Sequence, residues 1–410
     1  MAWQLIKNGG VTSPKGFLAS GMRCGFKPLT RKFDCSLIVS EKPATSAGVF
    51  TVNQAKAWPL LYNQSVILKP KHRAILANSG NANCFNGESG KRAVRSSLKL
   101  LSTTLKMKKE EIILASTGII GKPFPIEKLE AAVPVLVNQL SKAGGADAAR
   151  GILTTDTYPK EIAVRFRIGS KKITLGAMAK GAGMVFPHMT LTGERHATML
   201  CFLTTDLAIS KLMLAQALAE ATDRTFNHIA IDNDMSTNDM VVVLANGLAK
   251  NEPIIKPDRS FEAFKKVLTD VCAHIARELV RDGEGVRHVC EISVQGAKTR
   301  EDAKLVGKQI ATSMLVKTMF AGEDPNWGRV VAAVGASGAQ FSKDLDVAFD
   351  GVYILKNGKG LLRNRSQVRK VLQKKEFVLQ VNLKKGSIEE RFFTSDLTKF
   401  YVWINSRYSS

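Results

Sequence analysis

The chain has 410 residues, of which 45% are hydrophobic and 23% are charged, and its formal net charge is +23 at pH 7. This composition is typical of a folded globular protein with enough chain for two or three domains, and it excludes an intrinsically disordered protein. No segment approaches the roughly 18 consecutive apolar residues of a membrane-spanning helix. The N-terminal segment contains neither an apolar h-region nor an Arg- and Ser-rich presequence, so we expect a cytoplasmic protein.

The excess of positive charge raises the alternative of a nucleic-acid-binding protein. The 59 lysines and arginines are dispersed, however, with only a mild concentration between residues 356 and 385. That segment is not interleaved with the aromatic residues on which bases stack. We therefore favour a solvated basic surface, and we keep a basic binding protein on an inactive enzyme scaffold as an alternative.

The cysteines and histidines predict neither disulfides nor a metal site. The six cysteines are far apart and form no C-x-x-C pair, which fits buried free thiols in a reducing compartment. The segment DNDMSTND, residues 232–239, is acidic enough to suggest a calcium loop. It lacks the glycine and the closing glutamate of an EF-hand at the required spacing, so we expect a tight loop instead.

The N-terminal part alternates short apolar runs with clusters of turn-forming residues. Strands are predicted at residues 36–40, 46–50, 74–78 and 112–115, and helices at residues 90–105 and 126–140, the latter interrupted by Pro134. The sequence NSGNAN, residues 78–83, is so rich in Asn and Gly that we expect a tight loop.

The middle of the chain predicts a hairpin, followed by alternating strands and helices. Residues 161–168 and 171–178 pair over Gly169-Ser170 in this interpretation. Further strands are expected at residues 198–203, 227–231 and 240–244, and a helix at residues 210–222. A long helix has Phe264, Leu268, Val271 and Ile275 on one side.

Beyond residue 288 the pattern changes to a strand, a helix at residues 301–316 and basic strands such as residues 377–383. We therefore expect a catalytic domain at residues 1–288 and a smaller C-terminal α/β domain at residues 289–410. The segment after residue 400 returns to the active site in this interpretation.

One stretch, residues 180–206, differs from an ordinary core. Lys180 precedes a glycine-rich turn, which suits close approach of the backbone to a small ligand. Ala197-Thr198 then directly precedes the apolar run that begins at Met199. A threonine there can attack the preceding carbonyl, and hydrolysis of the resulting ester frees an α-amine beside the same hydroxyl. That amine, with an unperturbed pKa of about 7.7–8.0, can serve as the general base.

Two further segments add candidate site residues. In LASTGIIG, an apolar strand ends at Thr117-Gly118, where hydrogen-bond donors can face a developing oxyanion. In RDGEG, Glu284 lies between two glycines. For either segment alone, an ordinary turn is the commoner interpretation.

Taken together, these segments resemble the ornithine acetyltransferase (glutamate N-acetyltransferase) family. The resemblance runs nearly from end to end, and its motifs occur in the family's order: VTSPKGFLASG, NSGNANCFNG, LASTGIIG, TTDTYPK, KGAGM with ATML, IDNDMSTNDM, VRDGEGV, LVKTMFAGEDPNWGR and DLTKFYVWIN.

The resemblance implies an αββα sandwich with a smaller C-terminal domain. It also implies cleavage between Ala197 and Thr198 into two chains, which assemble as a heterotetramer of two α and two β chains. The reaction it implies is transfer of the acetyl group from N2-acetyl-L-ornithine to L-glutamate, with Thr198 as nucleophile and Thr117 and Gly118 as oxyanion hole. The implied substrate-binding residues are Thr154, Lys180, Thr198, Glu284, Asn405 and Ser410. No metal or organic cofactor is implied, and the family admits acetyl-CoA as a further acetyl donor.

The chain departs from the family pattern at residues 190–196, which separate the Pro-x-Met of the glycine turn from ATML. We expect this insert to be an exposed loop. Thr190 and Thr192 are rival nucleophiles by position, but the ATML context favours Thr198. A self-processing N-terminal-nucleophile amidohydrolase or aminopeptidase, with water as acceptor, is the main alternative function.

Overall fold

The computed structural model describes residues 3–27, 30–187, 189–191 and 199–407. The chain divides into two compact units. Of the described residues, the first unit contains those up to Asn227 together with Met235–Ile275, and the second contains His228–Asp234 and residues 276–407. In the described part of the chain, no helix is long and apolar enough to cross a membrane.

In the first unit, the described strands form a ten-stranded sheet that is folded into two layers. The 17-residue strand β3 (Cys35–Thr51) belongs to both layers, because its first half pairs with β2 and β4 and its second half with β11. The first layer contains β2 (Phe17–Met22), β3, β4 (His72–Asn81) and β5 (Ile112–Ile119). The second contains β1 (Gln4–Leu5), β6 (Lys160–Ile168), β7 (Lys171–Lys180), β9 (Leu200–Thr205), β11 (Met240–Ala245), the end of β3, and the short strand β8 (Met189–Thr190), which pairs with that end of β3.

The alternation of side chains along β3 explains why the layers stack. Ile38 packs in the core between the two sheets, in a cluster with Phe202 and Val242 of the second layer. Leu37 and Val39 face the opposite way and pack with apolar side chains of two helices, α2 (Gly87–Leu105) and α3 (Ile126–Asn138).

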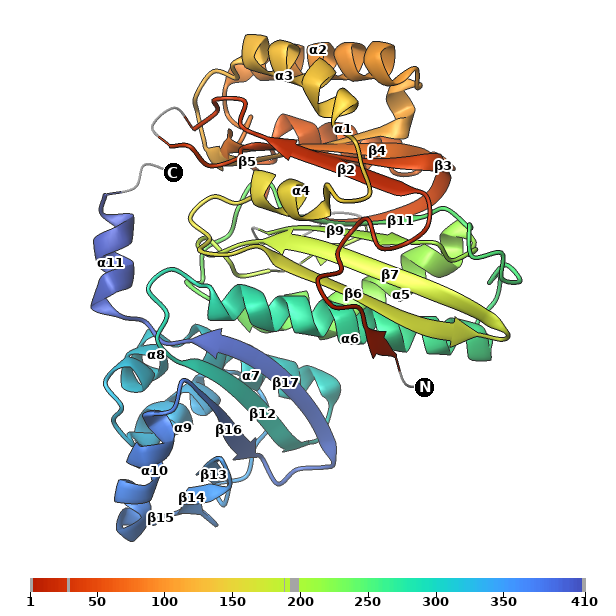
Figure 1. The fold of residues 1–410 in the computed structure, drawn as a ribbon. Coiled ribbons are helices and arrows are strands. Elements are labelled where there is room, and N and C mark those ends of the chain that lie inside the picture. Colours follow the sequence, from red (N-terminus) through yellow and green to blue (C-terminus); the bar gives the residue numbers. More distant parts are fainter. Residues whose placement is uncertain (1–2, 28–29, 188, 192–198, 408–410) are drawn as a thin grey trace. The chain divides into compact units, whose positions relative to one another are not determined.

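Helices α5 (Lys211–Arg224) and α6 (Arg259–Arg281) cover the second layer on its outer face (Figure 1). The order of layers in the first unit is therefore helix, sheet, sheet, helix. The predicted αββα sandwich is confirmed.

Several predicted elements of the first unit are confirmed, and two predictions are wrong. The hairpin of β6 and β7 and the helices α2 and α3 lie where the sequence places them, with Pro134 inside α3. The strands predicted at residues 36–40 and 46–50 are one strand, β3, whose exposed bend at residues 41–43 suggested a loop. The loop predicted at residues 78–83 is also wrong at its start, because β4 continues to Asn81.

The second unit contains a seven-stranded sheet among its described residues, in the order β10-β17-β12-β16-β13-β14-β15. Its strands are β10 (Ile229–Ala230), β12 (Val289–Ala297), β13 (Asp346–Phe349), β14 (Val352–Lys356), β15 (Lys359–Gly360), β16 (Glu376–Asn382) and β17 (Ile388–Ser395). Helix α7 (Arg300–Thr312) packs on β12 and β17.

The single helix predicted at residues 301–316 is two helices, α7 and α8 (Met314–Ala321). Ser313 separates them, because its extended backbone ends α7 and its hydroxyl accepts a hydrogen bond from the Val316 N–H at 3.3 Å. The serine therefore acts as the N-cap of α8. A serine at this position is a helix-start signal that can be read from the sequence.

The edge strand β5 is held by a side chain as well as by β4. Asn63 of helix α1 (Trp58–Val66) is fully buried, and its Nδ2 donates to the Leu114 carbonyl oxygen at 2.6 Å. Its Oδ1 accepts from the Leu114 N–H at 3.1 Å. The amide thus satisfies both backbone groups of Leu114, as a neighbouring strand would.

We expect Asn63→Ala to lower the free energy of unfolding by about 2–6 kcal/mol, because it leaves two buried backbone groups unpaired at about 1–3 kcal/mol each. Urea denaturation followed by circular dichroism measures the change. Asn138→Ala, at an exposed position of α3, is the matched control and should change little. Equal stability of the two variants would contradict this account of the β5 edge.

Candidate functional site

Two of the predicted site residues lie in contact in the first unit. Lys180 is the last residue of β7, and its Nζ donates a hydrogen bond to Thr117 Oγ1 at 3.3 Å. Both side chains are buried, at 3% exposure each. Because the Thr117 oxygen accepts from an ammonium, the single proton of that hydroxyl is directed elsewhere. Thr117 can therefore donate a hydrogen bond to a ligand.

Gly118 follows Thr117 in a backbone conformation that only glycine adopts without strain. Its φ is +128°, and a Cβ at this position would lie 2.5 Å from the Gly80 carbonyl carbon of the neighbouring strand β4. Any side chain here would push the end of β5 away from β4. The sequence Ser-Thr-Gly thus fixes the position of the Thr117 hydroxyl as well as that of the Gly118 backbone.

The predicted nucleophile and cleavage site, Thr198 and Ala197, lie outside the described residues. The strand that follows them in the sequence, β9, begins at Leu200 and runs between β7 and β11. Leu200 pairs with Lys180 on one side and with Met240 on the other. The described chain therefore resumes beside the Lys180–Thr117 contact. Of the insert, Thr190 and Leu191 are described, and both are exposed as expected, although Thr190 pairs with Phe50 of β3.

The loop that carries Thr154 is held by a buried carboxylate, Asp156, which is not among the predicted site residues. Asp156 Oδ1 accepts from Lys160 Nζ at 2.5 Å and from the Gly181 N–H at 2.8 Å. Asp156 Oδ2 accepts from the Thr154 N–H at 3.0 Å and from the Thr154 hydroxyl at 3.4 Å. In the segment TTDTYPK, the four-residue spacing between Asp156 and Lys160 was the sequence feature that could have indicated this ion pair.

Burial alone would raise the pKa of Asp156, but the positive charges of Lys160 and Lys180 outweigh burial and hold that pKa well below its ordinary value. Asp156 is therefore ionised at neutral pH. Its charge balances that of Lys160, whose side chain is fully buried.

Two further ionisable groups lie near Lys180. Burial lowers the pKa of Lys27 to about 8, with the Lys180 charge adding to the decrease and the Asp34 charge opposing it. Lys27 Nζ donates to the carbonyl oxygen of Leu153, next to Thr154, at 2.5 Å. Burial raises the pKa of Asp239 well above its ordinary value, although the Lys180 charge acts against this rise.

In the second unit, the structure brings together two other predicted residues. Asn405, the last residue of α11 (Lys399–Asn405), donates through Nδ2 to Glu284 Oε2 at 2.8 Å. Burial, and then the charges of Asp232, Asp234 and Glu284, raise the pKa of the nearby Tyr401. Ser410, the remaining predicted substrate residue, lies outside the described residues.

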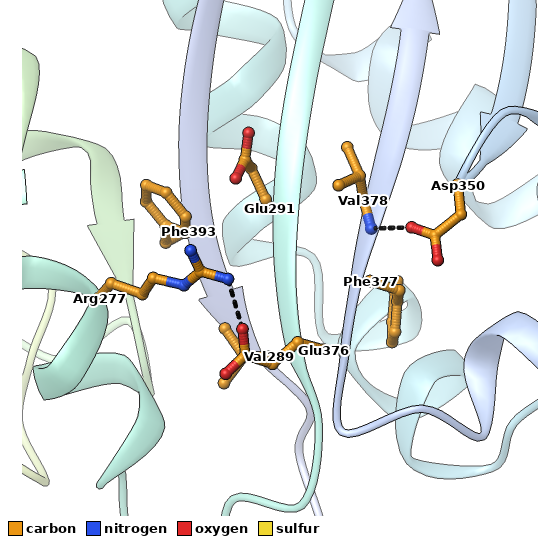
Figure 2. A pocket seen from close by; sticks show the side chains of 8 residues that line it. All are labelled: Arg277, Val289, Glu291, Asp350, Glu376, Phe377, Val378 and Phe393. Atoms are coloured by element: carbon orange, nitrogen blue, oxygen red, sulfur yellow. Dashed lines mark hydrogen bonds and ion pairs between the residues drawn. The ribbon is translucent and has the colours of Figure 1, made fainter. Parts of the chain in front are cut away.

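A pocket on the sheet of the second unit contains none of the predicted residues. Figure 2 shows Arg277 beside Glu376, with Glu291 and Phe393 close by and Asp350 at the far side. Arg277 forms an ion pair with Glu376, and Asp350 accepts from the Val378 N–H at 2.8 Å. Asp350 also pairs with Lys374 at 2.7 Å.

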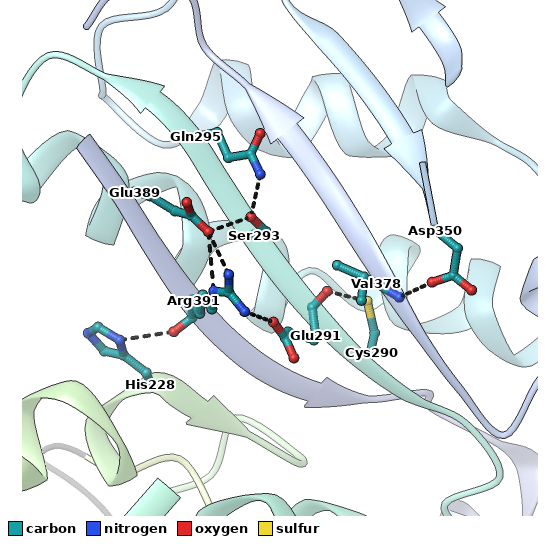
Figure 3. Close-up of polar contacts among 9 residues, drawn as sticks. All are labelled: His228, Cys290, Glu291, Ser293, Gln295, Asp350, Val378, Glu389 and Arg391. Atoms are coloured by element: carbon teal, nitrogen blue, oxygen red, sulfur yellow. Dashed lines mark hydrogen bonds and ion pairs between the residues drawn. The ribbon is translucent and has the colours of Figure 1, made fainter. Parts of the chain in front are cut away.

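The neighbouring polar groups on this sheet are paired with one another in the same way (Figure 3). Arg391 lies between two carboxylates, 2.9 Å from Glu291 and 3.1 Å from Glu389. Ser293 donates to Glu389 at 3.2 Å and accepts from Gln295 at 2.9 Å. We assign these contacts to the stability of the sheet, because the charged groups already balance one another.

Two sheets packed between helices, with buried polar side chains gathered at the ends of β5 and β7, define an αββα protein with an internal polar site. The chain belongs to the ArgJ family, whose model matches residues 18–410.

Among its relatives, the arginine biosynthesis bifunctional protein ArgJ of Symbiobacterium thermophilum is 42% identical over 98% of both chains. The glutamate N-acetyltransferase of Methanocaldococcus jannaschii is 41% identical over 99% of this chain and 100% of the relative. A solved structure of ArgJ from Bacillus halodurans is 38% identical with a TM-score of 0.48, and it covers 50% of this chain and 97% of that chain.

We expect Lys160→Met to lower the free energy of unfolding by about 3–5 kcal/mol, because it leaves the buried charge of Asp156 without its partner. Thermal and urea denaturation measure the loss. Arg150→Met is the matched control, since it breaks an exposed ion pair with Asp147 in the same unit and should cost less than about 1 kcal/mol. A Lys160 variant as stable as this control would show that Asp156 does not depend on the pair.

Proposed function

We propose that this chain transfers the acetyl group of N2-acetyl-L-ornithine to L-glutamate through an acetyl-threonyl intermediate on Thr198, as a step of arginine biosynthesis. The relatives named for this chemistry match along the whole chain, which supports the proposal. The structural observation that carries it is the hydrogen bond from Lys180 to Thr117, because it leaves Thr117 a donor beside the start of β9.

The first step in this proposal is self-cleavage between Ala197 and Thr198, which frees the α-amine of Thr198. That amine takes the proton of the Thr198 hydroxyl as the oxygen attacks the acetyl carbonyl carbon of acetylornithine. The Thr117 hydroxyl and the Gly118 N–H donate hydrogen bonds to the oxyanion. When the C–N bond breaks, the proton passes from the Thr198 amine to the departing α-nitrogen of ornithine.

Glutamate then reverses these steps. Its neutral α-amine attacks the acetyl ester, the Thr198 amine accepts the released proton, and Thr198 leaves as the hydroxyl. In this scheme Thr154, Lys180, Glu284, Asn405 and Ser410 hold the amino acid. Lys180 is the natural partner of the α-carboxylate, and Glu284 that of an ammonium.

The scheme requires no metal or organic cofactor. Acetyl-CoA is a further candidate acetyl donor for glutamate, which would make the chain bifunctional. The proposed mature form is a heterotetramer of two α and two β chains from one cytoplasmic precursor.

The proposal is tested by intact-mass analysis and initial-rate kinetics of the purified protein. Two chains divided at Ala197 and Thr198 are expected from the unaltered sequence, and a single chain from Thr198→Ala. Acetylornithine consumption should require glutamate, yield acetylglutamate and give parallel initial-velocity lines. Cleavage that persists in Thr198→Ala but stops in Thr190→Ala or Thr192→Ala would move the nucleophile to the insert. Acetate released at the same rate without glutamate would identify a hydrolase instead.

The oxyanion hole has a test of its own. Thr117→Val keeps the shape of the side chain but removes its hydroxyl, so kcat should fall by about 10²–10³, as for the loss of one oxyanion donor. Thr117→Ser retains the hydroxyl and is the matched control, for which most of the activity should remain. A valine variant with near-normal kcat would exclude Thr117 from the oxyanion hole.

A further inference from the structure

Asp156 joins two segments that carry proposed substrate-binding residues. Its Oδ2 holds the backbone and hydroxyl of Thr154, and its Oδ1 holds the N–H of Gly181, directly after Lys180. The Asp156 side chain is buried, so it acts on a ligand through these neighbours and not by contact with solvent. The Thr154 loop and the end of β7 therefore share one anchor.

This anchor also fixes the direction of the Thr154 hydroxyl group. An ionised carboxylate is only an acceptor, so the hydroxyl must give its single proton to Asp156 Oδ2. The paired ammonium of Lys160 keeps Asp156 in that ionised form. The oxygen of the half-buried Thr154 hydroxyl then presents its lone pairs to a ligand and accepts a hydrogen bond from it.

The Thr117 hydroxyl is oriented the opposite way, as a hydrogen-bond donor to a ligand. Its oxygen accepts from Lys180, so its proton is offered to a ligand. Lys180 and Gly181 are consecutive, and they hold Thr117 and Asp156 respectively. One threonine hydroxyl is thus set as a donor and the other as an acceptor. A secondary amide matches this pair, because it presents a carbonyl oxygen and an N–H group.

We propose that Asp156 is a positioning residue that sets the Thr154 hydroxyl as the hydrogen-bond acceptor for the α-nitrogen N–H of the substrate. The inference rests on the proposed function. In acetylornithine that group is the amide N–H, and in glutamate it is the attacking amine. With its N–H bonded to Thr154, the α-nitrogen is oriented as it leaves and as it attacks.

The proposal is tested by a double-mutant cycle of Asp156→Asn and Thr154→Val. In the asparagine variant, the amide oxygen replaces the carboxylate oxygen that faces Lys160 and Gly181, and the NH₂ group then faces Thr154. The Thr154 hydroxyl must accept from that NH₂ and turn its proton toward the ligand. We expect kcat/KM for acetylornithine to fall at least about tenfold, a change of about one hydrogen bond.

In the Thr154→Val background no hydroxyl remains to be reversed, so Asp156→Asn should reduce kcat/KM several-fold less than in the unaltered protein. The remaining loss comes from the backbone N–H of residue 154, which loses its acceptor in both backgrounds. Equal losses in the two backgrounds would show that Asp156 has a merely structural role and would overturn the proposal. Asp147→Asn, which removes an exposed carboxylate of the same unit, is the matched control and should leave kcat/KM unchanged.

A second measurement holds even if Asp156→Asn does not fold. Binding is followed by calorimetry in the two-chain form, made by co-expressing residues 1–197 with residues 198–410 that carry Thr198→Ala. The ligands are acetylornithine and its ester analogue, in which oxygen replaces the amide N–H. Thr154→Val should weaken binding of the amide at least about tenfold and that of the ester by less than about threefold. Thr154→Ser should bind both ligands as the parent does.

Equal weakening of both ligands by Thr154→Val would place the contact elsewhere on the substrate and refute the inference. This result differs from a failure of the proposed function. If the unaltered protein binds acetylornithine but does not transfer its acetyl group to glutamate, the function fails, while the binding measurements on the Thr154 variants still test the contact between Thr154 and the α-nitrogen. Absence of acetylornithine binding would overturn both.

Discussion

The polar interior of the first unit depends on one constraint, the burial of the Lys180 ammonium at the end of β7. A buried positive charge is stable only if nearby groups balance it and accept its hydrogen bonds. Thr117 accepts one such bond, and Asp156, whose pKa the Lys180 charge helps to lower, supplies negative charge near it. Asp156 also pairs with Lys160, so a single buried carboxylate interacts with two buried lysines.

Much of the first unit was predictable from the sequence, because its elements follow simple periodicities. The end of β6 alternates apolar and basic residues before a Gly-Ser turn, β7 continues from that turn as a buried strand, and α2 and α3 carry their apolar side chains on one face. The errors have local causes. Glycine and asparagine in NSGNAN suggested a loop, whereas Asn81 belongs to β4 and the Asn78 side chain donates to the Asn81 carbonyl oxygen at 2.8 Å.

The candidate site was predictable in its residue types but not in its contacts. Motifs singled out Thr117, Lys180 and Glu284, but sequence spacing carries no information that Lys180 reaches a threonine 63 positions earlier. Asp156 was missed because an aspartate between threonines in a turn is most often solvated. Only the tertiary structure shows that it is buried beside Lys160. The Glu284–Asn405 contact likewise joins residues 121 positions apart.

The order of strands in the second layer has a consequence for the proposed mature protein. Strands β7 and β3 precede Thr198 in the sequence, while β9 and β11 follow it, and the sheet places them as β7-β9-β11-β3. A cut before Thr198 would therefore leave the two strands of the later chain enclosed between two strands of the earlier chain. Six residue pairs join β9 to β7, and six join β11 to β3. Two such chains could not be separated or exchanged without dismantling the sheet, so peptide cleavage would leave a molecule that still unfolds as one body.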